Sequence, residues 1–187
     1  MKLREKNLKI LKSNHVYSEE MEHDACGVGL VASTEGLKSR KVVEYGIDAL
    51  KAVWHRGAID ADGKTGDGAG IHIEIPKDFF EEKIEVTGHK HDNSELCVGM
   101  IFLPRNDYSA QEQCRTIVES ELTKRNFSIY GWRQVPVDPS VLGEKAEQTR
   151  PEITQVLFTY DDKKVVNKSL EQKLYETRRV IEKEALN

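Results

Sequence analysis

The stretch that decides the fold reads Met21-Glu22-His23-Asp24-Ala25-Cys26-Gly27-Val28-Gly29-Leu30-Val31. Its cysteine lies where an acidic, polar leader changes to small and β-branched residues, a pattern typical of the start of a buried strand. The glycines on either side of Val28 let another backbone or a ligand approach closely. The pattern predicts a strand over residues 27–33 with a thiol directly before it.

The chemistry of Cys26 depends on the peptide bond that precedes it. A cysteine at the edge of a buried strand is most often a small core hydrophobe. If that peptide bond is cut, the freed α-amine has a pKa of about 7.7–8 and can accept the thiol proton, directly or through a water. While the leader remains attached, the same nitrogen is an amide and cannot act as a base. The residues themselves leave both interpretations open.

Composition excludes several classes of function. Of 187 residues, 38% are hydrophobic and 32% charged, with a net charge of −4; this balance lacks the basic stripe of a nucleic-acid-binding protein. No apolar run approaches the roughly 20 residues of a membrane span. The lysine-rich start is not followed by the apolar region of a secretory signal. We therefore expect neither nucleic acid nor a membrane as a partner.

The cysteines indicate the compartment. There are three, Cys26, Cys97 and Cys114, and no CxxC pair. An odd number without pairing motifs favours a reduced, cytoplasmic protein with neither a disulfide framework nor a zinc ribbon. Cys97 and Cys114 lie in apolar patterns and are predicted to be core residues.

Hydrophobic periodicity predicts alternating helices and strands. Helices are expected over 39–55, 76–82, 109–125 and 170–185, and strands over 27–33, 71–75, 96–103, 127–137 and 153–160. Ser39 suits an N-cap and Gly57 a left-handed C-cap. The continuous apolar run 96–103 is expected to be a central strand, and 141–151 a charged connection. The spacing is not that of a Rossmann fold and favours an α+β protein.

Three polar motifs have a plain structural interpretation. His55-Arg56-Gly57 ends a predicted helix, where basic residues commonly interact with the helix dipole. Thr65-Gly66-Asp67-Gly68-Ala69-Gly70 precedes a strand and so is not a dinucleotide fingerprint; Asp67 is expected to bond backbone amides in a tight loop. His89-Lys90-His91-Asp92 lacks a second ligand cluster and is expected to be a solvated loop instead of a metal site.

Taken in order, three motifs resemble one family: His23-Asp24-Ala25-Cys26-Gly27-Val28-Gly29, His55-Arg56-Gly57-Ala58 and Thr65-Gly66-Asp67-Gly68-Ala69-Gly70-Ile71. They resemble the N-terminal glutaminase domain of the glutamate synthase large subunit, a class II, N-terminal-nucleophile glutamine amidotransferase. Three further stretches are similar to the same subfamily: Pro136-Val137-Asp138-Pro139, Leu142-Gly143-Glu144-Lys145-Ala146 and Pro151-Glu152-Ile153. The resemblance runs from about His23 to the C-terminus.

The resemblance implies a fold and a domain organisation. It implies an α+β fold that is the N-terminal, incomplete portion of a four-layer αββα sandwich with mainly antiparallel sheets. Residues 1–25 would be a leader, or propeptide, that is removed. Residues 26–187 would be the N-terminal part of the glutamine amidotransferase type-2 domain.

The resemblance also implies a reaction and its residues. Cys26 would attack the side-chain amide of L-glutamine, release ammonia and leave a thioester that water hydrolyses to glutamate. Gly27, Arg56, Asp67 and Gly70 would support the nucleophile and the substrate. No cofactor is expected in this chain. In the full-length enzyme the ammonia would pass to 2-oxoglutarate at a synthase site that uses FMN, an iron–sulfur cluster and NAD(P)H or ferredoxin. The partners implied are the synthase domains of the same polypeptide and a small reductase subunit.

One departure from the family limits the expected activity. The family binds the glutamine carboxylate through an Arg-Phe-Ser-Thr segment and builds its oxyanion hole from a His-Asn-Gly-Glu segment, and this sequence contains neither. Loss of one oxyanion donor can cost roughly 10²–10³ in turnover. The expectation is an N-terminal fragment that by itself releases little ammonia.

Two alternatives stay open. The chain could be a non-catalytic, unprocessed fragment that acts only as a binding or regulatory module. It could also belong to another hydrolase with a processed N-terminal cysteine, which the His-Arg-Gly and Gly-Asp-Gly-Ala-Gly motifs disfavour.

Overall fold

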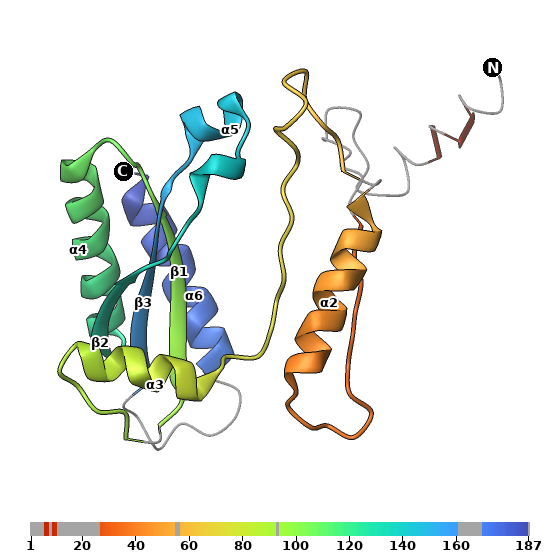
Figure 1. Cartoon of the computed structure of the whole chain (residues 1–187). Coiled ribbons are helices and arrows are strands. Elements are labelled where there is room, and N and C mark those ends of the chain that lie inside the picture. Colours follow the sequence, from red (N-terminus) through yellow and green to blue (C-terminus); the bar gives the residue numbers. More distant parts are fainter. Residues whose placement is uncertain are drawn as a thin grey trace. The chain divides into compact units, whose positions relative to one another are not determined.

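The computed structural model describes residues 6–7, 9–10, 27–54, 57–92, 94–160 and 170–186. The chain divides into two compact units, and each is described by itself. The first comprises Met1–Asp60 and Gly66–Ile71, and the second comprises Ala61–Thr65 and His72–Asn187. Both contain helix, but the named strands lie in the second, so the described chain is a mixed helix and sheet structure (Figure 1).

The second unit is built on a three-stranded antiparallel sheet. Its strands are β1 (Leu96–Leu103), β2 (Phe127–Gln134) and β3 (Glu152–Tyr160), in the order β1-β3-β2. The prediction of 96–103 as the central strand was wrong, because β3 lies in the middle and β1 at an edge. Burial shows why: β3 is buried continuously from Thr154 to Tyr160, whereas β1 exposes Met100 and Phe102.

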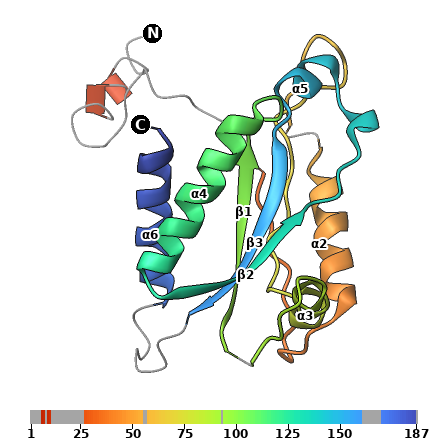
Figure 2. The ribbon, with the colours of Figure 1, turned by 90° about the vertical axis from the view of Figure 1, so that its left-hand side faces the viewer.

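Helices cover both faces of this sheet and create two cores. α4 (Tyr108–Lys124) and α6 (Leu170–Ala185) pack against one face and against each other, and α3 (Lys77–Val86) lies across the other (Figure 2). The core under α4 and α6 consists of Cys97, Val118, Leu122, Phe127, Val156, Phe158 and Tyr160. The core under α3 consists of Phe80, Ile84, Leu96, Tyr130 and Leu157. Successive residues of β3 alternate between the two cores, as the pleat of a strand requires.

A β-bulge interrupts β2. The pairing with β3 runs from Phe127 to Ile129 and resumes at Gly131, so Tyr130 is an extra residue on this strand. Gly131 has φ +148, and a Cβ there would lie 2.9 Å from the Thr87 methyl group. The bulge therefore requires glycine at 131 and directs the Tyr130 ring into the core under α3.

Local end signals predicted the helices well. The Ser39 hydroxyl accepts a hydrogen bond from the Lys41 amide and caps α2 (Arg40–Ala52), as expected. Gly57 is not a left-handed C-cap, because α2 already ends at Ala52 and Gly57 does not have a positive φ. α3 extends four residues beyond its predicted end. The connection 141–151 contains a short helix, α5 (Glu144–Thr149), after the 3-10 turn η2 (Pro139–Val141).

Two predicted strands are not formed. Residues 27–33 and 71–75 belong to no ladder, and Val28 and Leu30 are 91% and 92% exposed. An alternating apolar pattern becomes a strand only where a neighbouring strand accepts its backbone hydrogen bonds. In the described part of the chain no strand lies beside either segment, so the pattern alone was not sufficient.

None of the helices in the described ranges has the length and apolar character needed to cross a membrane.

Candidate functional site

The predicted site residues lie in the first unit. Cys26 and Arg56 fall outside the described residues, as does His55. Gly27, Asp67 and Gly70 are described and exposed, and a Cβ on Gly70 would meet no atom within 4 Å. Of the described site residues, Asp67 is the one whose partner the structure identifies.

Asp67 connects the glycine-rich loop to the segment that follows His55-Arg56-Gly57. Its Oδ2 accepts a hydrogen bond from the backbone N–H of Ala58 at 3.0 Å. The partner is a backbone amide, as predicted, but it lies nine residues earlier in the chain and not in the tight loop 65–70. Beside this bond, Ile59 and Gly66 form an isolated antiparallel bridge. A Cβ on Gly66 would lie 3.1 Å from the Ala58 carbonyl oxygen, so glycine allows the close approach. The residues that follow His55-Arg56-Gly57 are thereby held against the glycine-rich loop.

A second carboxylate, that of Asp62, organises a turn in the second unit. Its Oδ1 accepts the amides of Lys64 at 2.9 Å and Thr65 at 2.7 Å, and the Thr65 hydroxyl donates to Oδ2 at 2.5 Å. The Thr65 hydroxyl, followed by these amides, lowers the pKa of Asp62 to about 2. No sequence motif singled out Asp62, although an Asp followed by a glycine, here Gly63 with φ +70, is typical of a turn closed by a side chain.

His91 corrects the prediction of a solvated loop. Its side chain is only 4% exposed, and its Nδ1 lies 3.2 Å from Glu81 Oε1 on α3. The ring stands edge-on to Tyr130 at 5.9 Å, and its buried Nε2 has no hydrogen-bond partner. The bulge that directs Tyr130 inward provides the surface that buries this histidine, a long-range effect that the local sequence does not encode.

The residues near His91 do not form a metal centre. Across the described ranges, no three His, Cys, Asp or Glu side chains are grouped as metal ligands would be. His89 contacts the Thr87 hydroxyl at 3.0 Å.

Of the two described cysteines, Cys97 is a buried core residue. It is 4% exposed, and burial, followed by the nearby charges of Glu95 and Glu171, raises the pKa of its thiol to about 12. A thiol with this pKa is neutral at pH 7 and a poor nucleophile. Cys114 on α4 is half-buried. Cys97 is therefore unsuited to the role proposed for Cys26.

A shallow pocket of about 510 Å³ lies at the start of α4, lined by Arg105, Arg115, Trp132, Gln134, Glu152 and Thr154 among others. Its charged groups each have a hydrogen-bond partner. Arg105 bonds Glu147, and Arg115 bonds Glu112 at 2.5 Å. Arg133 donates to Gln155 and Glu152 accepts from Gln134, both at 2.6 Å. The pocket contains none of the predicted site residues.

Comparison with known proteins places the chain in a family. Residues 26–187 match the class-II glutamine amidotransferases. The chain is 52% identical to the glutamate synthase (NADPH) large chain of Azospirillum brasilense over 95% of its own length, and 36% identical to the ferredoxin-dependent glutamate synthase of Pyropia yezoensis over 94%. It is 38% identical to the glutamate synthase (NADH) of Saccharomyces cerevisiae over 79%.

The chain spans only a small part of these relatives, 12%, 11% and 7% of their lengths respectively. The family match itself covers most of the chain and includes the Asp67 loop and the whole second unit. This chain belongs to the class-II glutamine amidotransferases.

Proposed function

We propose that this chain carries the glutaminase part of a glutamate synthase, with Cys26 as its nucleophile. The observation that carries the proposal is the start of the family match, which begins at Cys26 itself and leaves residues 1–25 outside. This boundary supports a leader, 1–25, that is removed to make Cys26 the first residue. Residues 26–187 would then be the N-terminal part of the amidotransferase domain.

The proposed reaction follows from a cysteine at a chain terminus. The freed α-amine of Cys26 accepts the thiol proton, and the sulfur adds to the side-chain amide carbon of L-glutamine. The tetrahedral intermediate collapses, the amide nitrogen takes a proton and leaves as ammonia, and a thioester remains. Water then hydrolyses the thioester to glutamate and regenerates the thiol.

The supporting residues act by holding backbone near the nucleophile. In this proposal Gly27 leaves space beside the sulfur, and Arg56 stabilises the nucleophile region. Asp67 bonds the Ala58 amide at 3.0 Å, which fixes the chain two residues after Arg56. Gly70 keeps the end of the loop free of side chain.

The finer fold proposed is the four-layer αββα sandwich of N-terminal-nucleophile enzymes. The second unit supports this proposal with two adjacent layers, a helical layer of α4 and α6 and the sheet whose face they cover. The opposite face carries the exposed side chains of Met100 and Phe102 beyond the area that α3 covers. An apolar sheet face of this kind suits a second sheet.

For the whole protein we propose that the ammonia is transferred to 2-oxoglutarate by synthase domains of the same polypeptide, with a small reductase subunit as a further partner, in the cytoplasm. FMN, an iron–sulfur cluster and NAD(P)H or ferredoxin would serve there. This chain does not fit the cluster, because a cluster takes about four thiolates and the cysteines here are Cys26, the buried Cys97 and Cys114. These groups belong to the rest of the proposed enzyme.

The decisive experiment uses the protein as its organism makes it. Intact mass and N-terminal sequencing are expected to find a chain that starts at Cys26, and glutamine is expected to yield ammonia. Cys26→Ser is expected to lower that yield by at least 10³-fold, as loss of a nucleophile does. Cys114→Ser on α4 is the matched control and should leave the yield unchanged.

Two results would overturn the proposal. One is a protein that keeps Met1 and releases no ammonia from glutamine, which is the outcome for a non-catalytic binding or regulatory module. The other is full glutaminase activity in Cys26→Ser. A second version of Cys26→Ser, expressed without residues 1–25, separates failure of leader removal from loss of the thiol.

A further inference from the structure

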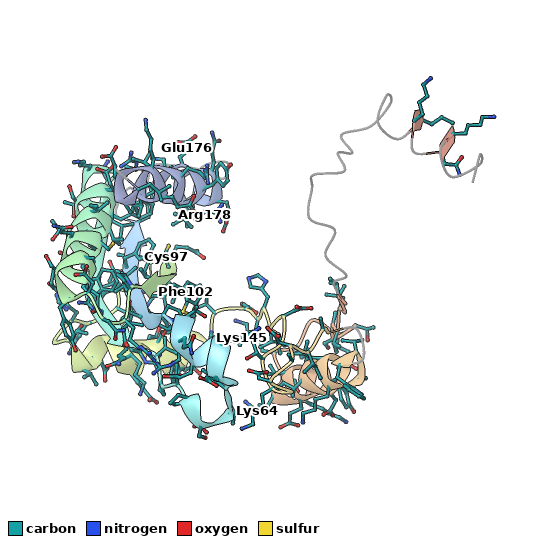
Figure 3. The ribbon with its side chains drawn as sticks, turned by 90° about the horizontal axis from the view of Figure 1, so that it is seen from above. Lys64, Cys97, Phe102, Lys145, Glu176 and Arg178 are labelled. Atoms are coloured by element: carbon teal, nitrogen blue, oxygen red, sulfur yellow. The ribbon has the colours of Figure 1, made fainter. Side chains whose placement is uncertain are left out.

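The turn 61–65 is fastened to the start of α5. Besides the two amides of its own turn, Asp62 accepts a hydrogen bond from the backbone N–H of Lys145. Lys145 is the second residue of α5, whose N-cap, Gly143, has no side chain to offer. Asp62 therefore acts as an N-cap from outside the helix, because it accepts a hydrogen bond from one of the first-turn amides that an N-cap side chain normally bonds. We call this contact, between Ala61–Thr65 and Gly143–Lys145, the Asp62 clasp; Lys64 and Lys145 are labelled there in Figure 3.

The clasp is a close fit. A Cβ on Gly143 would overlap with Thr65 Oγ1 and Asp62 Oδ2 and would lie 2.6 Å from the Thr65 nitrogen. The backbone of Gly143 has φ −75 and ψ 161, which any residue can adopt. Glycine is thus required at this position for space and not for conformation. Gly143 is also buried.

The chain on either side of the clasp leads to the proposed site. Ile59, before the turn, bridges to Gly66, after it, and the next residue, Asp67, bonds Ala58. Ala61 thus lies two residues after Ile59, and Thr65 lies one residue before Gly66. A turn that is fixed at five residues restricts where the chain can enter and leave the loop 66–70.

We propose that Asp62 is a positioning residue for the glutaminase: by closing the clasp on α5 it holds the Ile59–Gly66 bridge and, through it, Asp67. This inference rests on the proposed function of the site. It assigns to the Leu142-Gly143-Glu144-Lys145 segment the role of holding the turn 61–65, which connects Ile59 to Gly66. Asp62 touches neither substrate nor nucleophile in this role.

The ionisation of Asp62 supports the clasp over the working pH range. Its pKa of about 2 lies below the value of about 4 that an unfolded Asp has. A group whose pKa is lower in the folded state than in the unfolded state stabilises the folded state at pH values above the unfolded pKa. For Asp62 this contribution is lost as the pH falls from about 4 toward 2. The clasp is therefore expected to be fully closed at neutral pH.

The test combines amide hydrogen exchange with glutamine kinetics in the protein as its organism makes it. Asp62→Ala is expected to speed exchange at the Lys145 and Thr65 amides, and also at the Ala58 amide, by about tenfold or more as local opening becomes easier. It is expected to lower kcat for glutamine by about tenfold, since small displacements of positioning groups have such effects. Asp62→Asn keeps the acceptor oxygen and should recover most of both losses.

Gly143→Ala should open the clasp by an independent route, because the added Cβ would overlap with Asp62 and Thr65. This substitution changes neither Asp62 nor the loop itself. It should reproduce the faster exchange at Ala58. Asp48→Ala, an exposed Asp of α2 whose nearest cation is 3.9 Å away, is the control and should change neither readout.

The outcomes are distinct. The inference is overturned if exchange at Lys145 accelerates in Asp62→Ala while exchange at Ala58 and kcat stay at wild-type values, because the clasp would then be structural only. If wild-type protein has no glutaminase activity, the proposed function fails, and the Ala58 exchange rate still decides whether the clasp holds the loop.

Discussion

The two units differ in how their residues are held. Every described hydrophobic residue that is buried belongs to the second unit, between Phe80 and Tyr160. In the first unit α2 has a capped N-terminus and an apolar face but no buried residue, and Trp54 is 74% exposed. Yet the proposed site residues all lie in the first unit. The core and the site are therefore built from different parts of the chain.

The difference shows that local hydrogen bonds, and not burial, order the described part of the proposed site. Asp67 is fixed by the Ala58 amide and the turn before it by Asp62. Such bonds between exposed groups stabilise a fold much less than a buried apolar side chain in the core does. We expect a substitution in the second unit to lower the free energy of unfolding in proportion to the burial of the residue. A substitution in the first unit should mainly change the local order of the chain.

The largest expected effect is in the core under α3. Leu157 on the central strand is 0% exposed, so Leu157→Ala should lower the free energy of unfolding by about 2–5 kcal/mol through lost transfer and a cavity. Leu30→Ala, at a side chain that is 92% exposed, should stay within about 0.5 kcal/mol. Urea unfolding followed by tryptophan fluorescence measures both. Equal losses for the two leucines would contradict the contrast between the units.

A matched pair of glycines gives the next largest effect. Gly99 on β1 faces Val156, and an added Cβ would lie 2.7 Å from a methyl group of that valine. Gly99→Ala should therefore cost about 1–3 kcal/mol from overpacking. Gly29→Ala in the first unit meets no atom within 4 Å and should be neutral or slightly stabilising. A denaturation midpoint that moves equally in both variants would show that the two sites are packed alike.

Helix caps sharpen the comparison further. Asp107 accepts the Ala110 amide at the start of α4, and Ser39 accepts the Lys41 amide at the start of α2. Asp107→Ala should lower the unfolding free energy of the sheet by about 1 kcal/mol. Ser39→Ala should instead reduce helicity near α2, seen as faster amide exchange there, and leave the main unfolding transition in place. A shifted main transition in Ser39→Ala would mean that α2 and the sheet unfold as one.

The smallest effect near neutral pH concerns Cys97. Burial raises its pKa to about 12 from 9.0. A raised pKa means that the unfolded chain loses its thiol proton first, so the stability contributed by the neutral thiol is complete below about pH 9 and declines as the pH rises toward 12. The difference in unfolding free energy between wild type and Cys97→Ala should follow this course. A difference that is flat from pH 8 to 11 would show that Cys97 titrates normally in the folded protein.

Sequence signals predicted the parts of the fold that depend on near neighbours. Ser39, Asp138-Pro139 and the periodicity of 109–125 gave the helix starts, the turn and α4 nearly to the residue. The position of β3 in the middle of the sheet was not predictable, since it depends on which distant strands pair. The alternation at 71–75 does not produce a strand for the same reason.

The candidate site was predictable to a similar degree. The glycine-rich composition of the loop 65–70 predicted that Asp67 bonds a backbone amide, and Asp67 does bond the amide of Ala58. His91 is buried against Tyr130, which is 39 positions away in the sequence, and Asp62 bonds Lys145, which is 83 positions away. No local sequence pattern encodes contacts over such separations.

The bulge at Tyr130 has a consequence for the opposite face of the sheet. In an unbroken strand, residues 130 and 132 would point the same way. The extra residue reverses the alternation, so the Tyr130 ring joins the core under α3 while Trp132 turns toward α4. There the indole N–H donates to Glu119 at 2.7 Å and the ring stacks with Arg115. The bulge thus directs one aromatic ring toward each helical layer, whereas a regular strand would point both rings to the same side of the sheet.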